Sequence, residues 1–208
     1  MSPDVVITDA PAAPSRLSPQ QSPPLHVLVI APSLVPDEGT PAPVEFVNAL
    51  AGAGMRVMFA AAVGPLRTEL SRDVRYLLID DAGNAPIKTA HELSRIIRHH
   101  QPDVVHFHGA RCALVGALAV KASHVGCARV MTHVSPLGRI PDWIKGPLLR
   151  RCADRYFAAD ATLGAELEAL HVPQERIQVE SVQPDHAPAY ARDSIAAYRS
   201  LVQSGESS

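Results

Sequence analysis

Segments typical of buried strands alternate with segments typical of helices along most of the chain. Short apolar runs rich in β-branched residues indicate the strands, and apolar residues spaced three or four apart indicate the helices. The expected strands are residues 25–31, 55–61, 74–79, 104–107, 129–132, 155–158 and 176–179. The expected helices are residues 44–53, 88–100, 110–123, 141–151, 162–170 and 194–202. Such alternation predicts a single Rossmann-like α/β domain, a doubly wound parallel sheet covered by helices on both faces.

The length and composition fit one domain with tails. The 208 residues are 47% hydrophobic, which suffices for one sizeable core. Ten of the 19 prolines fall before residue 44, and the first six lie in a stretch rich in serine, alanine and glutamine. We therefore expect residues 1–24 to form a disordered, proline-rich tail, residues 25–186 to form the domain, and residues 187–208 to contain a last helix with a frayed end.

Charge and cysteine content exclude several classes of protein. The net charge of −2 argues against a nucleic-acid partner recognised by bulk charge. The three cysteines, Cys112, Cys127 and Cys152, are widely spaced, which favours reduced thiols over a disulfide framework or a zinc site. The N-terminus lacks the pattern of a signal peptide, and the most apolar window, residues 110–125, is too short and too polar to span a bilayer. The sequence thus predicts a cytoplasmic protein.

The strand expected at residues 104–107 carries most of the functional information. It lies in the run Pro-Asp-Val-Val-His-Phe-His-Gly at residues 102–109, so His106 and His108 share one face of the strand. The carboxyl ends of parallel strands form the edge where α/β proteins bind ligands. Two histidines at this edge could donate hydrogen bonds to a ligand or could bind zinc together with His133. No acidic or cysteine ligand at a recognised spacing supports zinc, so we expect no metal site.

Four stretches together resemble the N-terminal domain of family 4 glycosyltransferases, retaining enzymes with the two-domain GT-B fold. The first is the opening strand, the turn at Gly39 and the following helix. The second is the histidine-bearing run, and the third is Val-Met-Thr-His at residues 130–133. The fourth is the run from residue 152 to residue 179. The resemblance covers roughly residues 25–185, and its pieces are weak singly but fairly specific in this order.

The resemblance implies a fold and a set of site residues. In that family the N-terminal domain binds the acceptor, a carbohydrate or a lipid-linked molecule, and a nucleotide sugar lies between the two domains. His106 and His108 would then be catalytic, and Gly39, Thr40, His133 and Ser135 would bind substrate. A nucleotide-sugar donor is implied only by this resemblance, and no other cofactor is expected.

The sequence also departs from the family pattern. Glu38 replaces a glycine of the glycine turn, and a carboxylate there would repel a donor phosphate. Asp160 stands where the family has serine. The second domain, which holds most nucleotide contacts, is missing from this sequence, whereas Tyr190 and the residues up to 202 resemble the closing helix of GT-B enzymes. We therefore expect the acceptor-binding half of a transferase, inactive alone, whose last helix packs back on the domain. Removal of residues 188–208 should destabilise it.

Three functions remain open. The first is a split enzyme for surface polysaccharide or glycolipid synthesis, in which the chain supplies the acceptor half and a separate donor-domain protein is the partner. The second is a non-catalytic binding or regulatory module descended from a transferase, and the third is a small enzyme of another kind that uses the histidine-rich cleft. Residues 137–151, including Arg139, Trp143 and Lys145, have the mixture of basic and apolar side chains that suits an acceptor face or peripheral contact with the inner face of a membrane. An ordinary amphipathic helix with solvated arginines explains the same pattern.

Overall fold

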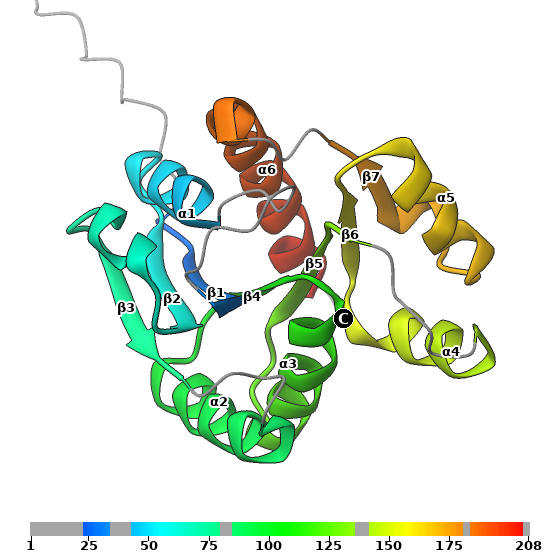
Figure 1. Ribbon diagram of the computed structural model, residues 1–208, viewed down its shortest axis with the longest axis horizontal. Coiled ribbons are helices and arrows are strands. Elements are labelled where there is room, and N and C mark those ends of the chain that lie inside the picture. Colours follow the sequence, from blue (N-terminus) through cyan, green and yellow to red (C-terminus); the bar gives the residue numbers. More distant parts are fainter. Residues whose placement is uncertain (1–22, 34–42, 80–84, 136–141, 181–183, 206–208) are drawn as a thin grey trace, which may run out of the picture.

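The computed structural model describes residues 23–33, 43–79, 85–135, 142–180 and 184–205 (Figure 1). The strands are β1 (His26–Ser33), β2 (Arg56–Ala62), β3 (Val74–Leu78), β4 (Val104–His108), β5 (Ala128–His133), β6 (Arg155–Ala158) and β7 (Ile177–Val179). They form one parallel sheet in the order β3-β2-β1-β4-β5-β6-β7. The fold class predicted from the alternation of elements is therefore confirmed.

Six α-helices connect and cover these strands. They are α1 (Pro43–Gly52), α2 (Pro86–His100), α3 (Ala110–Ser123), α4 (Asp142–Cys152), α5 (Ala161–Ala169) and α6 (Ala187–Gly205) among the described residues. The helix α6 begins seven residues before the predicted segment 194–202. Pro188 fits its first turn, because backbone N–H groups there have no intrahelical acceptor and proline lacks that N–H. None of the helices in the described part of the chain is long and apolar enough to cross a membrane.

The pleat of the central strand separates two cores. All five residues of β4 are buried. Val105 and Phe107 point into a core shared with α2, α3, α4 and α5, whereas Val104 points into a second core shared with α1 and α6. Figure 1 shows α1 and α6 side by side on one face of the sheet, with α2 and α3 on the other. Successive side chains of β4 thus enter different cores, because side chains of a strand point alternately to its two faces.

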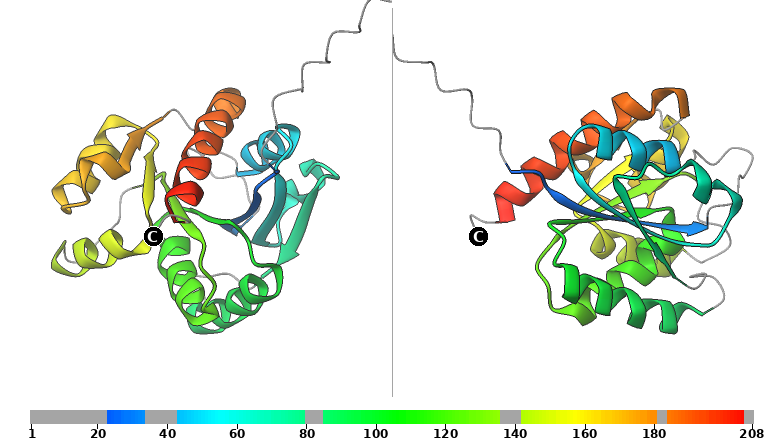
Figure 2. Two further views of the ribbon diagram at one scale, coloured as in Figure 1. Left: turned by 180° about the vertical axis from the view of Figure 1, so that it is seen from behind. Right: turned by 90° about the vertical axis from the view of Figure 1, so that its left-hand side faces the viewer.

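The last helix fills a place that the crossovers leave open. Right-handed crossovers in this strand order put the helices that lead to β4, β5, β6 and β7 on one face and leave α1 alone on the other. The α1 face of β4, β5 and β6 would then be bare. The helix α6 runs back across this area beside α1 (Figure 2) and buries Tyr190, Ile195 and Tyr198 there.

On the opposite face, α3 packs unusually close to β4. Gly116 in the middle of α3 faces the ring of Phe107, and a Cβ atom at this position would lie 2.1 Å from Phe107 Cε1. Only glycine fits between the helix backbone and the ring. The contact fixes α3 directly behind the strand that carries the two histidines.

Candidate functional site

His106 is fully enclosed between the sheet and α6. Its side chain is 0% exposed. The Nδ1 atom is 2.5 Å from the hydroxyl oxygen of Tyr198, and the Nε2 atom is 2.5 Å from the hydroxyl oxygen of Thr132. Thr132 is in turn hydrogen-bonded to the hydroxyl group of Tyr190. We call His106, Thr132, Tyr190 and Tyr198 the buried network.

The buried network holds a neutral imidazole. Burial lowers the pKa of His106 well below its usual value of 6.5, and a charge on His108 would lower it further. A neutral ring donates through one nitrogen and accepts through the other, which two hydroxyl partners satisfy without charge. Phe46 of α1 lies edge-on to His106 at a centroid distance of 5.1 Å and stacks on Tyr190 at 4.5 Å. A sugar could touch the His106 ring only after α6 had moved.

His108 ends the same strand and points to the same face as His106. It is 2% exposed and pairs in register with Thr132 of β5. Gly109 follows with a φ of +88°, a conformation that glycine adopts without strain, and its N–H donates to the carbonyl oxygen of Thr132 at 2.9 Å. This turn ends β4 and starts α3 at the carboxyl edge of the sheet.

His133 lies at the carboxyl end of β5 but points to the opposite face. Thr132 belongs to the buried network on the α6 face, so the next residue, His133, faces α5. Its Nε2 atom is 2.9 Å from a carboxylate oxygen of Glu166, whose side chain is 27% exposed. The Nδ1 atom of His133 is buried and has no hydrogen-bond partner among the described residues. The carboxylate therefore favours the tautomer in which Nε2 carries the proton and Nδ1 is an acceptor.

The structure brings only some of the predicted site residues together. His106 and His108 share one face, His133 lies on the other, and Ser135 is exposed two residues beyond it. Gly39, Thr40 and Arg139 lie outside the described residues. Trp143 and Lys145 belong to α4, but their side chains also lie outside the described part. The catalytic and substrate-binding roles of all these residues stay predictions.

Sequence reasoning missed the partners of the histidines. Glu166, Tyr190 and Tyr198 were not singled out as site residues, because each lies at least 33 residues from the histidine it contacts. One signal was available, since Tyr190 and Tyr198 are eight residues apart and therefore fall on the same face of a helix. Asp160 replaces the family's serine and still caps α5, because its carboxylate accepts the N–H of Leu163 at 2.8 Å.

The described residues favour neither a metal site nor a cysteine nucleophile. No three metal-ligating side chains cluster among them. Burial raises the pKa of the Cys127 and Cys152 thiols to about 11, so both are protonated at neutral pH. The polar chemistry of this domain thus rests on its histidines and their hydroxyl and carboxylate partners.

Comparison with known proteins gives the family and the fold. The family model described as Glycosyltransferase Family 4 matches residues 44–179. The structure resembles a glycosyltransferase from Rickettsia africae with a TM-score of 0.62 and 15% identity, over 76% of this chain and 43% of that one. It resembles Anabaena HepE in complex with UDP-glucose with a TM-score of 0.59 and 13% identity, over 74% and 43%.

A third similar structure belongs to a protein described with a different activity. It is described as a UDP-N-acetylglucosamine 2-epimerase from Listeria monocytogenes, with a TM-score of 0.56 and 15% identity, over 75% of this chain and 45% of that one. The chain thus spans less than half the length of these three proteins. No curated protein matches. At these identities the solved structures establish the GT-B-type Rossmann-like fold and nothing finer.

Proposed function

We propose, from the premise that this chain belongs to glycosyltransferase family 4, that it is the acceptor-binding half of a sugar-nucleotide-dependent transfer system. The acceptor, a carbohydrate or a lipid-linked molecule, would lie at the carboxyl edge of β4 and β5. The nucleotide sugar would be held by a second lobe that this sequence does not include. We place the reaction in surface polysaccharide or glycolipid synthesis, on the cytoplasmic side of the membrane.

The observation that carries the proposal is the pair formed by His133 and Glu166. A histidine whose Nε2–H is held by a carboxylate keeps Nδ1 as an acceptor for a hydroxyl proton. Because the His133 side chain is 0% exposed, an acceptor hydroxyl would reach Nδ1 only after a neighbouring segment had moved. An acceptor hydroxyl must lose its proton when it attacks the sugar, and such a group can take it. His133 is the last residue of β5, so the pair lies at the carboxyl edge of the sheet, where open α/β sheets bind ligands.

The two halves would have different roles in the reaction. This half would orient the acceptor, and the second lobe would stabilise the charge that develops on the leaving diphosphate. Because Glu38 takes the sequence position at which the family has a glycine near the donor phosphates, the isolated chain should bind a nucleotide sugar poorly. It should therefore be inactive alone.

One observation favours a second function, a non-catalytic binding or regulatory module. His106, which the resemblance makes catalytic, has no exposed surface and is hydrogen-bonded on both nitrogens. A module that has lost catalysis would keep such a histidine only for packing. On this alternative, the domain would still bind a carbohydrate but would not support transfer when a donor lobe is added.

Nuclear magnetic resonance of the histidine rings tests the proposed function. We would titrate the full chain with octyl glucoside and octyl galactoside as acceptor analogues, and with UDP-glucose as the donor. The proposal expects the glycosides to shift the His133 signal and Glu166→Gln to weaken binding about tenfold, or about 1.4 kcal/mol. His99→Ala, an exposed histidine at the end of α2, is the matched control and should leave binding unchanged. If no glycoside shifts any ring signal, the acceptor role is wrong.

A further inference from the structure

A groove between α3 and α4 lies away from the candidate site. It is a half-open cavity of about 520 Å³. Gly126 and Arg129 line it at the beginning of β5, so it opens at the amino-terminal edge of the sheet. His133 and Ser135 lie at the other end of the same strand. A second lobe seated on the carboxyl edge would leave this groove, which we call the α3–α4 groove, uncovered.

The α3–α4 groove exposes apolar side chains from both of its helices. Leu118 of α3 is 53% exposed and Leu148 of α4 is 42% exposed. Both line the groove, together with Leu114 and Val125. A single exposed leucine needs no explanation, whereas these two lie on different helices and border one cavity.

The charged side chains of the α3–α4 groove are all basic. Lys121, Arg129 and Arg151 line it. The guanidinium of Arg129 is already paired, because its Nη2 atom lies 2.6 Å from a carboxylate oxygen of Asp154. The other carboxylate oxygen of Asp154 accepts the backbone N–H of Arg129 at 2.9 Å. Neither Lys121 nor Arg151 has a carboxylate partner among the described residues, and α3 has no acidic residue.

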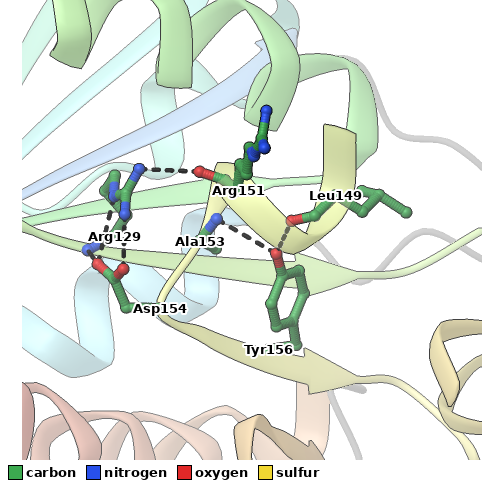
Figure 3. Close-up of polar contacts among 6 residues, drawn as sticks. All are labelled: Arg129, Leu149, Arg151, Ala153, Asp154 and Tyr156. Atoms are coloured by element: carbon green, nitrogen blue, oxygen red, sulfur yellow. Dashed lines mark hydrogen bonds and ion pairs between the residues drawn. The ribbon is translucent and has the colours of Figure 1, made fainter. Parts of the chain in front are cut away.

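Hydrogen bonds tie the backbone at the end of α4 to β5 and β6, as Figure 3 shows. The Nη1 atom of Arg129 donates to the carbonyl oxygen of Arg151 at 2.9 Å, which ties β5 to the end of α4. The hydroxyl of Tyr156 donates to the carbonyl oxygen of Leu149 and accepts the N–H of Ala153 at 3.2 Å. The end of α4 is thereby fixed on β5 and β6, so Leu148 and Arg151 keep their positions beside α3.

We propose that the α3–α4 groove is a membrane-binding surface that docks on anionic lipids. Leu118 and Leu148 enter the boundary between head groups and acyl chains, and Lys121 and Arg151 contact the lipid phosphates. Apolar side chains flanked by unneutralised cations are the combination that interfacial binding requires. Cations near the carboxyl ends of two helices are explained by the helix dipoles alone. The helix dipoles do not explain the two exposed leucines, which fit the boundary between water and lipid.

The proposal does not depend on the acceptor role, since it rests on the opposite edge of the sheet. Trp143 and Lys145, for which the sequence predicts membrane or acceptor contact, lie at the beginning of α4. Docking through the end of α4 would hold the domain at the membrane while the carboxyl edge stays open to a second lobe. Tethering and acceptor binding would then use separate surfaces.

Vesicle flotation with the full chain tests the proposal. We would compare vesicles of phosphatidylcholine alone with vesicles containing 30% phosphatidylglycerol. We expect flotation only with the anionic vesicles, and a loss of flotation of about tenfold in Leu118→Glu, in Leu148→Glu and in the pair Lys121→Gln and Arg151→Gln. Leu78→Glu is the matched control, because Leu78 is 66% exposed on β3 and lies outside the groove. Unfolding midpoints equal to that of the wild type would show that the variants fold.

Two results would overturn the proposal. One is a failure of the flotation pattern, in which the wild type does not float with the anionic vesicles or Leu78→Glu loses flotation as much as Leu118→Glu. The other is a concentration-dependent dimer in sedimentation experiments that Leu118→Glu abolishes, because the groove would then be an interface between two copies of this chain.

Discussion

The hydroxyl group of Tyr198, in the last helix of the domain, lies 2.5 Å from the Nδ1 atom of His106 in the central strand of the sheet. The two residues are 92 positions apart in sequence. Their hydrogen bond fastens α6 onto the face of the sheet that the crossover helices leave bare. It also means that His106 has a structural role, since its ring joins the sheet to α6.

We predict that Tyr198→Phe destabilises the domain by about 1–3 kcal/mol. The substitution keeps the ring but leaves the Nδ1 atom of a fully buried imidazole without its partner. Urea unfolding at pH 7.5 measures the free energy. Tyr76→Phe is the control, because Tyr76 lies on the edge strand β3 and its only partly buried hydroxyl donates to the carbonyl oxygen of Ala61. Equal losses in the two variants would mean that the bond to His106 has no special weight.

Stability should fall as the pH drops below about 6.5. Burial lowers the pKa of His106 well below 6.5 in the folded state, so only the unfolded chain binds this proton. The free energy of unfolding then decreases by up to about 1.4 kcal/mol per pH unit below 6.5 and is unaffected above it. Burial also lowers the pKa values of His26 and His100, which adds to the same slope.

Urea unfolding between pH 5 and pH 8 measures this slope, and His106→Gln should flatten it. The ring signal of His106 in the folded wild type provides an independent readout, because it should not titrate before the protein unfolds. A His106 ring that titrates near pH 6.5 in the folded protein would contradict the buried, neutral imidazole.

Removal of residues 188–208 should abolish cooperative thermal unfolding. The truncation takes away Tyr190, Ile195 and Tyr198 and exposes the face of the sheet on which they pack. Large apolar side chains that become exposed lose about 1.5–3 kcal/mol each, more than a small domain can spare. Differential scanning calorimetry makes the measurement. A truncated chain with the melting temperature of the intact one would show that α6 is dispensable.

Gly116→Ala should destabilise the domain by about 1–3 kcal/mol through overpacking. A Cβ atom would lie 2.1 Å from one ring carbon of Phe107 and 2.5 Å from the next, and the ring is itself fully buried. Gly52→Ala is the matched control, because nothing lies within 4 Å of its Cβ position at the end of α1. Gly52→Ala should be neutral or stabilising, since alanine is the better helix former. An unchanged stability in Gly116→Ala would require the strand and helix to separate easily.

The sequence predicts this fold well because its signals are local. The run from Val104 to Phe107 begins with two β-branched valines and lies between Pro102 and Gly109, which favours a short buried strand. The same holds for the other strands. Family resemblance, rather than local pattern, is what suggested that His133 belongs with His106 and His108.

The site is harder to predict because it depends on contacts between distant elements. Thr132 and His133 are neighbours in sequence but point to opposite faces, so Thr132 joins the buried network and His133 pairs with Glu166. A shift of one residue in the pairing of β5 with β4 would exchange the faces on which the two side chains lie. The observed register with β4 places Thr132 toward α6 and His133 toward α5. Which helix covers each face is a property of topology, and no local pattern near His106 could indicate Tyr198.

The most direct test of the account is titration calorimetry of UDP-glucose into the purified chain, with release of UDP followed in the presence of octyl glucoside. The account predicts no saturable binding at millimolar donor and no release of UDP, because the donor belongs to a second lobe. Micromolar affinity together with turnover on the order of 1 s⁻¹ or faster would contradict it, since this chain would then be a complete enzyme.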